Sequence, residues 1–172
     1  MRTWLLGASL AALACTGGDA YGTKASAGSP KPAPAMVGKT IAGDAFDLDA
    51  LRGTVVLVNV WATWCAPCRE ELPELEALHR EHAARGFTVI GVSVDRAAAL
   101  MQVRQMVDSF ALSYPIVFDP MSKAIADWDV RGYPTSFLVD RTGVIRWRRD
   151  GIIRPEDPEL TPLLKLALDT PQ

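Results

Sequence analysis

The sequence predicts an α/β domain in which helices cover both faces of a mixed central sheet. Two nearly continuous apolar runs, 54–60 and 87–94, are rich in β-branched residues and indicate strands that are buried on both faces. Segments with helical spacing of apolar residues alternate with these strands. Two further strands, 135–139 and 144–149, flank the turn Asp140-Arg141-Thr142-Gly143, which is typical of an antiparallel hairpin. Parallel and antiparallel pairs are therefore expected in one sheet.

The first fifteen residues have the layout of an export signal. Met1–Thr3 supplies a positive end and Trp4–Ala14 an apolar run, which is followed by small residues. This run is shorter than the ~20 residues that a membrane-spanning helix needs. The stretch Ala-Ala-Leu-Ala-Cys that ends at Cys15 resembles a bacterial lipobox, whose cysteine carries a lipid anchor. Cleavage near Ala14 or further on, with Cys15 unmodified, is the alternative.

Residues 16–35 are predicted to form a disordered linker. They are rich in Gly, Ser, Ala and Pro and hold too little apolar material to compensate for the entropy of ordering. Behind a lipid anchor, such a linker would keep the domain close to a membrane surface at high local concentration. The folded domain is expected to cover 36–172.

Helical spacing is clearest from Cys65 to Arg85, where Gly86 is placed to end the helix and Pro73 to kink it. The other elements are expected in this order: short strand-like pieces between Val37 and Leu48, a helix over 97–111, a strand over 114–118, a short helix over 121–128 and an amphipathic helix over 159–168.

Length and charge argue for one soluble globular domain that does not bind nucleic acid. The chain has 172 residues, a formal net charge of −2 and 22% charged residues. Binding to phosphates needs clustered Lys and Arg, and only Arg146–Arg149 comes close to such a cluster. Its charges alternate with an apolar neighbour, which indicates the wet face of an exposed strand.

Only two cysteines, Cys65 and Cys68, lie outside the signal region. A disulfide-rich scaffold is therefore excluded, and a disulfide across two residues closes too small a loop to restrict the unfolded chain much. His79 and His82 follow with a superficially zinc-like spacing. On one helix, however, His79 would lie about 16 Å along the axis from Cys68, whereas ligands of one zinc ion lie within about 4 Å of one another. We expect no metal site and two histidines on the solvated helix surface.

Redox chemistry suits the pair Cys65 and Cys68 better than a structural disulfide or a metal site does. At a helix N-terminus, Cys65 meets unpaired backbone N–H groups and the positive end of the helix dipole, which stabilise a thiolate. Cys65 is the predicted nucleophile. Cys68, about one turn further on, is expected to be more buried and to attack the mixed disulfide, releasing the partner. Pro67 fits the first helical turn, so that Ala66 and Pro67 form a stiff, uncharged spacer. The cysteine pair needs no separate cofactor.

The run VLVNVWATWCAPCREELPEL, together with GYPT at Gly132–Thr135, resembles the thioredoxin fold, and specifically the exported TlpA/ResA/CcmG-like thiol–disulfide oxidoreductases. The resemblance covers roughly Val37 to Leu168. It implies a thioredoxin-like fold with an N-terminal strand extension and a βα insertion between Ser93 and Asp119. It also implies that Pro134 is cis and lies against the active-site disulfide.

The resemblance also suggests roles for residues around the cysteines. Thioredoxin has a buried aspartate where this chain has Asn59. Glu71 matches a family glutamate that relays the proton of the resolving thiol, here that of Cys68; burial would raise its pKa for this task. Alternatively, Glu70 and Glu71 are acids that the helix dipole favours in the first turn.

Further residues of the resemblance are expected to surround the exposed sulfur. Trp64 is expected to flank it, and Trp64, Ala66, Pro67 and Tyr133 are the predicted substrate contacts, whereas Trp61 belongs either to the site or to the core. Asp95 either shapes a substrate groove or simply ends a strand.

The uncharged spacer stabilises a thiolate less than the spacers of strongly oxidising relatives, which favours a reductant. The resemblance implies a periplasmic or cell-envelope location, a membrane thiol transporter as electron donor, and exported clients with disulfides. Apocytochrome c, in cytochrome c maturation, and copper-site assembly factors are examples of such clients. A monomer is expected.

Three other functions stay open. A thiol peroxidase of the same superfamily would need a threonine three residues before its reactive cysteine, where this chain has Ala62. A copper or haem chaperone would bind its ligand through reduced Cys65 and Cys68 and a methionine, but Met101 and Met106 are expected to belong to the core side of a helix. A catalytically idle interaction domain is the third alternative.

Overall fold

The computed structural model describes residues 31–171. Its elements are β1 (Lys31–Pro32), β2 (Val37–Lys39), β3 (Ala45–Asp47), η1 (Leu48–Leu51), β4 (Val55–Trp61), α1 (Ala66–His82), η2 (Ala83–Arg85), β5 (Phe87–Ser93), η3 (Ala97–Ala99), α2 (Leu100–Ser109), β6 (Ile116–Phe118), α3 (Lys123–Asp127), β7 (Thr135–Val139), β8 (Val144–Asp150) and α4 (Leu160–Asp169). The predicted export signal, Cys15 and most of the predicted linker lie outside the described residues. None of the helices within 31–171 combines the length and apolar character that crossing a membrane requires.

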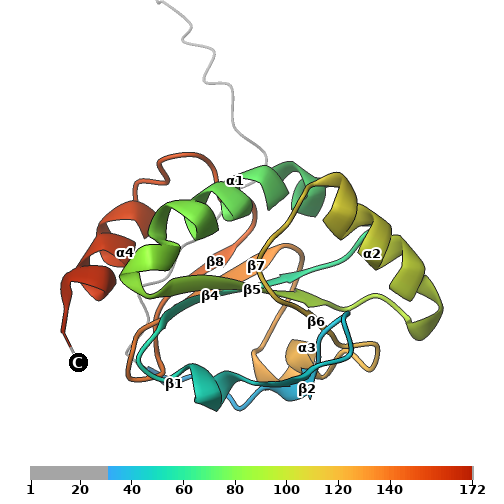
Figure 1. Ribbon diagram of the computed structural model, residues 1–172, viewed down its shortest axis with the longest axis horizontal. Coiled ribbons are helices and arrows are strands. Elements are labelled where there is room, and N and C mark those ends of the chain that lie inside the picture. Colours follow the sequence, from blue (N-terminus) through green and yellow to red (C-terminus); the bar gives the residue numbers. More distant parts are fainter. Residues whose placement is uncertain (1–30, 172) are drawn as a thin grey trace, which may run out of the picture.

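The main sheet has the strand order β1-β8-β7-β4-β5-β6 (Figure 1). Strand β4 pairs in parallel with β5 and antiparallel with β7, so the sheet is mixed, as predicted. Helices α1 and α4 lie on one face of it, while α3 and the β2–β3 hairpin lie on the other (Figure 1). The segment from β5 through α2 to the parallel strand β6 is the predicted βα insertion.

The ordered chain begins before residue 36, where the folded domain was predicted to start. Lys31 and Pro32 pair with Ile145 and Val144 of β8, and the Ala33 N–H donates to the Gly143 carbonyl at 2.9 Å. The predicted disordered linker, 16–35, is therefore wrong at its C-terminal end. Composition indicated disorder because this segment has few apolar residues, but the free edge of β8 supplies the backbone partners that such a segment needs.

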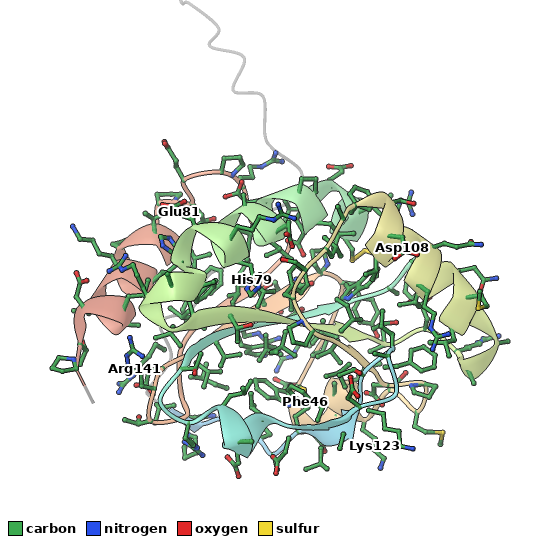
Figure 2. The ribbon with its side chains drawn as sticks, viewed as in Figure 1. Phe46, His79, Glu81, Asp108, Lys123 and Arg141 are labelled. Carbon is green, nitrogen blue, oxygen red and sulfur yellow. A yellow bond between two sulfur atoms is a disulfide. The ribbon has the colours of Figure 1, made fainter. Side chains whose placement is uncertain are left out.

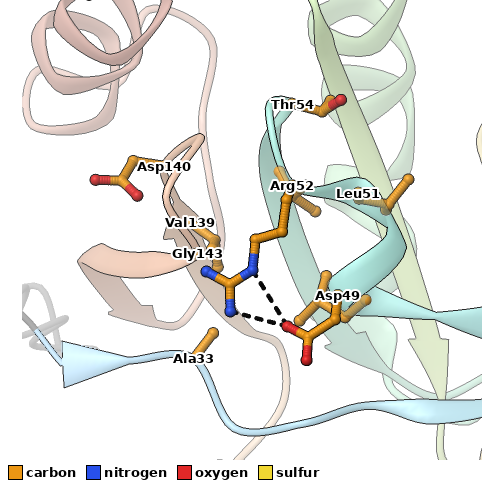
Figure 3. Close-up of a pocket in the computed structure, with 10 residues that line it drawn as sticks. Ala33, Asp49, Leu51, Arg52, Thr54, Val139, Asp140 and Gly143 are labelled. Carbon is orange, nitrogen blue, oxygen red and sulfur yellow. Dashed lines mark hydrogen bonds and ion pairs between the residues drawn. The ribbon is translucent and has the colours of Figure 1, made fainter. Parts of the chain in front are cut away.

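A small pocket marks the place where this N-terminal segment meets η1 and the β7–β8 turn (Figure 3). Arg52 crosses it: its guanidinium donates to Asp49 at 2.8 Å and also to the Thr142 carbonyl. Gly143 has a φ of 78° and packs so closely against Arg52 that a side chain there would collide with the guanidinium. The predicted hairpin turn is thus also an anchor for the start of the domain.

The core lies on both faces of β4 and β5, and α1 packs on one of these faces. Every residue of β4 is buried, as predicted for a strand covered on both faces. On α1, Leu72 and Leu75 are fully buried. The helix ends in η2, and Gly86 follows in the left-handed region with a φ of 78°, which confirms the predicted stop. The predicted helix over 97–111 is divided into η3 and α2.

The prediction that His79 and His82 lie on a solvated helix surface is wrong, because both are half-buried. His79 points from α1 toward the sheet (Figure 2), where its Nδ1 lies 3.5 Å from the Val89 N–H and its ring meets Tyr114 edge-on. His82 packs edge-on against Phe87. Within 31–171, no three His, Cys, Asp or Glu side chains lie close enough together to hold a metal ion.

Leu75→Ala is expected to lower the free energy of unfolding by about 2–5 kcal/mol, because it leaves a cavity between α1 and the sheet. Leu166→Ala is the matched control: Leu166 is 64% exposed, and its truncation should change stability by no more than about 0.5 kcal/mol. Urea unfolding followed by tryptophan fluorescence measures both variants. Equal losses would contradict the assignment of α1 to the core.

Candidate active site

The two cysteines form a disulfide at the N-terminus of α1. Cys65 is the N-cap residue, with extended backbone angles, and its Sγ accepts a hydrogen bond from the Cys68 N–H at 3.2 Å. Pro67 occupies the first turn, where the missing N–H costs nothing. Cys68 is fully buried and Cys65 is 6% exposed, so Cys65 is the less buried of the two, in the order predicted.

A second loop lies at the same end of the sheet and carries the predicted proline. The Tyr133–Pro134 peptide bond is cis, as the resemblance implied. Strand β7 starts directly after it, and the Thr135 hydroxyl contacts the Gly132 carbonyl at 2.8 Å and Asp150 at 3.1 Å. These contacts hold the loop at both ends of the proline.

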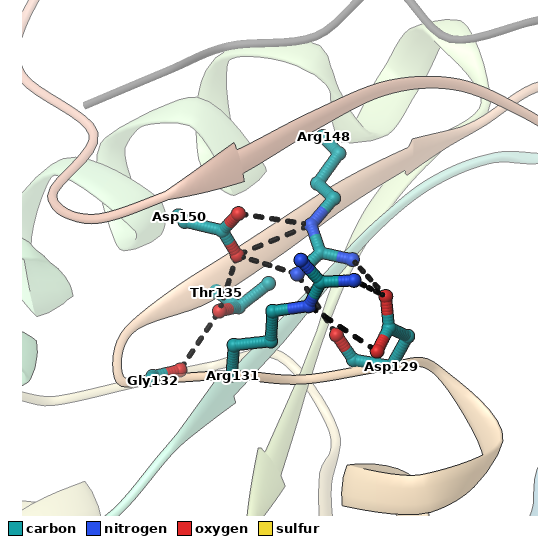
Figure 4. Close-up of polar contacts among 6 residues, drawn as sticks. All are labelled: Asp129, Arg131, Gly132, Thr135, Arg148 and Asp150. Atoms are coloured by element: carbon teal, nitrogen blue, oxygen red, sulfur yellow. Dashed lines mark hydrogen bonds and ion pairs between the residues drawn. The ribbon is translucent and has the colours of Figure 1, made fainter.

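Charged side chains anchor this loop to β8 (Figure 4). Arg148 donates to Asp150 at 2.7 Å and to the main-chain carbonyl of Asp129 at 2.9 Å. Arg131 pairs with the Asp129 carboxylate on the exposed side. Asp150, which Arg148 orients, is the same residue that meets Thr135, so β8 sets the position of the segment that carries the proline.

The loop before α1 and the loop before β7 bring two predicted contact residues together. The rings of Trp64 and Tyr133 meet edge-on with their centroids 5.5 Å apart. Trp64 is 64% exposed, and Ala66 and Pro67 are exposed in the first helical turn. Three of the predicted substrate contacts are therefore exposed beside the cysteines, and the half-buried Tyr133 reaches them through Trp64, whereas Trp61 is fully buried and belongs to the core.

Glu71 is a buried carboxyl one helical turn after Cys68. It is 1% exposed; its Oε1 accepts from the Asn59 side chain at 2.6 Å and its Oε2 from the Ile153 N–H at 2.9 Å. Burial raises the pKa of Glu71 to about 8, although both hydrogen bonds act in the opposite direction. This is the buried environment that the resemblance implied, and it differs from the solvated position of Glu70, the other acid that the helix dipole could favour in the first turn.

The partners of Glu71 were not predicted. Asn59 was noted only as the replacement of an aspartate, yet it is fully buried and donates to both Glu71 and Ser136. One signal was available, because an amide within an apolar strand must find a partner. Ser136 lies opposite Asn59 in the β4–β7 register, and Ile153 comes from the segment after β8. Neither position can be inferred from sequence spacing alone.

Asp95 is the other buried carboxylate at this end of the sheet. It is 1% exposed and accepts hydrogen bonds from the N–H and the hydroxyl of Thr63, two residues before Cys65. The sequence left open whether Asp95 shapes a groove or ends a strand. It comes after Val94, just beyond the end of β5, and its contacts lie inside the protein, where they reach the loop that carries Cys65.

Comparison with known proteins agrees with this geometry. The model of the AhpC/TSA family matches residues 30–148. The thioredoxin-like protein YneN of Bacillus subtilis is 38% identical over 176 residues, covering 98% of this chain and 99% of that protein. The thiol-disulfide oxidoreductase ResA of Geobacillus kaustophilus is 31% identical over 92% of this chain and 91% of its own.

A solved structure shows the same fold with the same kind of chemistry. The thiol:disulfide interchange protein of the thioredoxin family from Chlorobium tepidum superimposes with a TM-score of 0.70 at 32% identity, over 82% of this chain and 98% of its own. The disulfide at the start of α1 is the redox motif that these relatives lead one to expect. The chain therefore belongs to the AhpC/TSA family, as a thioredoxin-like thiol–disulfide oxidoreductase.

Proposed function

We propose that this protein reduces disulfides of exported client proteins through a cycle between the Cys65–Cys68 dithiol and its disulfide. The observation that carries this proposal is the position of the disulfide, with Cys65 as the N-cap of α1 and the Cys68 N–H directed at its sulfur. A helix N-terminus favours negative charge, so the same N–H group stabilises a thiolate on Cys65 once the disulfide is reduced.

In the first step, the Cys65 thiolate attacks one sulfur of a client disulfide. A mixed disulfide forms between Cys65 and that sulfur, and the other client sulfur leaves as a thiolate. The exposed Trp64, Ala66 and Pro67 and the neighbouring Tyr133 provide the surface on which the client rests. The backbone next to Pro134, at the same end of the sheet, completes this surface.

In the second step, Cys68 attacks Cys65 and releases the client's second thiolate. Two electrons have then passed from the protein to the client, and the Cys65–Cys68 disulfide has formed again. Cys68 must first lose its proton, and its fully buried sulfur has no access to bulk water in the oxidised state. Glu71, one turn away with a pKa near 8, accepts this proton, because its proton affinity is close to that of a thiol.

The proposal also assigns a direction of electron flow, from the uncharged spacer, and partners, from the exported compartment. The spacer of Ala66 and Pro67 adds no charge that would favour the dithiol strongly, so the reduced form is a good donor. In an exported compartment the protein would draw electrons from a membrane thiol transporter. Apocytochrome c and copper-site assembly factors are the client classes that suit this role. The protein acts as a monomer at the cell envelope, held by a lipid on Cys15 where the lipobox is used, and its cysteine pair needs no further cofactor.

Cys65→Ser is expected to abolish disulfide reduction, because it removes the nucleophile. Cys68→Ser should instead trap the mixed disulfide with the client, because the resolving thiol is missing. Insulin reduction and non-reducing gel electrophoresis measure these two outcomes. Trapping in the native host, followed by mass spectrometry, identifies the client. Equal residual turnover in both variants would contradict the assigned roles.

Glu71→Gln is expected to slow the resolving step about tenfold or more, because the amide cannot accept the Cys68 proton. The fraction of ionised Glu71 rises through its pKa of about 8, so the resolving rate of the wild type should rise with pH, with an inflection near pH 8 that the variant lacks. Stopped-flow measurement of client release between pH 6 and pH 9 tests this. Glu70→Gln is the control, since Glu70 is exposed; an unchanged pH profile in Glu71→Gln would return Glu71 to a structural role.

Glu71 should also make the stability of the oxidised protein fall as pH rises. Its pKa is raised from 4.5 to about 8 in the folded protein, so between these values the folded state keeps a proton that the unfolded chain has lost. The free energy of unfolding is then expected to decrease by up to roughly 4 kcal/mol from pH 4.5 to pH 8. Urea unfolding at several pH values measures this decrease. A difference between wild type and Glu71→Gln that stays constant with pH would contradict it.

A further inference from the structure

We propose that Asp95 is a positioning residue of the dithiol site, which acts on Cys65 through Thr63. This inference rests on the dithiol cycle proposed above, in which the reactivity of Cys65 depends on where its sulfur meets the start of α1. Asp95 takes no part in that cycle, and yet it is a carboxylate that is 1% exposed at the same end of the sheet. Burying a carboxylate is costly, so its contacts call for an explanation.

All polar groups of Thr63 are held by two side chains. Its N–H donates to Asp95 Oδ2 at 2.9 Å, and its hydroxyl donates to Asp95 Oδ1 at 2.7 Å. Its carbonyl accepts from the Arg69 guanidinium at 2.9 Å. Thr63 is therefore held from two sides, by Asp95 just beyond the end of β5 and by Arg69 in the first turns of α1.

Further hydrogen bonds hold Asp95 itself in place. The Ser93 hydroxyl donates to Asp95 Oδ2 at 2.9 Å, and the Val94 N–H donates to the Trp61 carbonyl at 3.0 Å, which ties the end of β5 to the end of β4. A functional group keeps its geometry best when it is supported by packed elements and by further hydrogen bonds. The Asp95 carboxylate thus fixes the loop in front of α1 relative to the sheet.

This loop is short, so the position of Thr63 determines where Cys65 lies. Only Thr63 and Trp64 separate Ala62 from Cys65, and the Cys65 N–H donates back to the Ala62 carbonyl at 3.1 Å. The Cys65 sulfur must stay aligned with the Cys68 N–H, now 3.2 Å away, for that group to stabilise a thiolate. Hydrogen bonds weaken steeply as their geometry departs from the optimum. Loosening Thr63 should therefore reduce the fraction of Cys65 that is ionised.

A role of Asp95 through its charge alone would have the opposite sign. A negative charge near a thiol disfavours the thiolate, so removing it would make Cys65 more reactive. A role in positioning predicts that removing Asp95 makes Cys65 less reactive. The direction of the change therefore decides between the two.

Glu76 provides a matched control within the same protein. It is also a buried carboxylate, and it accepts from the N–H and the hydroxyl of one loop residue, Ser113, both at 2.8 Å. This pair repeats the chemistry of Asp95 and Thr63, but it ties the middle of α1 to the loop before β6. Glu76→Ala should lower stability in the same way as Asp95→Ala without touching the loop in front of Cys65.

The experiment measures alkylation of Cys65 by iodoacetamide in the reduced full-length protein as a function of pH, read by tandem mass spectrometry at that residue. Asp95→Ala and Thr63→Val are expected to slow alkylation at pH 7 about threefold to tenfold and to move the midpoint of the pH profile upward by about 0.5–1 unit. Thr63→Ser, which keeps the hydroxyl, and Glu76→Ala should retain the wild-type profile. Urea unfolding of each variant confirms that the measured protein is folded.

Faster alkylation in Asp95→Ala would overturn the proposal in favour of a simple charge effect. An unmoved profile in both Asp95→Ala and Thr63→Val, with stability lowered as in Glu76→Ala, would overturn it in favour of a structural tie. The wild type separates this test from that of the proposed function. If wild-type Cys65 reacts like free cysteine and insulin is not reduced, the dithiol cycle itself fails, whatever the variants do.

Discussion

The chemistry of this protein depends on the passage of the chain from β4 into α1. Strand β4 is buried along its whole length between β5 and β7, so its end is held in place by the core. The helix that follows begins at Ala66, after a short loop, and presents its first N–H groups to Cys65. A disulfide between Cys65 and Cys68 closes across these groups. The buried strand β4 therefore fixes the Cys65 sulfur at one position relative to the positive end of α1.

Two buried carboxyl groups flank this passage, and their environments give them different tasks. Among residues 31–171, Glu71 accepts from two donors, Asn59 and Ile153, and burial outweighs them, so that its pKa is raised to about 8. Asp95 receives three donors from Thr63 and Ser93. A carboxyl that is poorly compensated is suited to exchange a proton, whereas one that is surrounded by donors is suited to hold a loop. The hydrogen bonds that each carboxyl group accepts therefore distinguish the role of Glu71 in proton transfer from the role of Asp95 in positioning.

The errors of the sequence-based predictions have specific physical causes. The segment 31–35 was assigned to a disordered linker because its composition is poor in apolar residues, but pairing with β8 depends on backbone groups, which composition does not describe. His79 and His82 were assigned to the solvated helix surface once helix geometry had excluded a shared zinc site, yet their rings pack against Tyr114 and Phe87. For the segment 31–35 and for His79, a neighbour that is distant in the sequence determined the outcome.

The sequence by itself determined the mixed α/β sheet, the cysteine pair at a helix start and the proline before β7, because each of these is written in residues that are close together along the chain. Only the tertiary structure decided what surrounds them. The contacts of Glu71 with Asn59 and Ile153, of Asp95 with Thr63, and of Trp64 with Tyr133 join separate elements. Local patterns specify secondary structure through short-range sterics and periodicity, whereas the pKa of a buried acid depends on groups that only folding brings within a few ångströms of it.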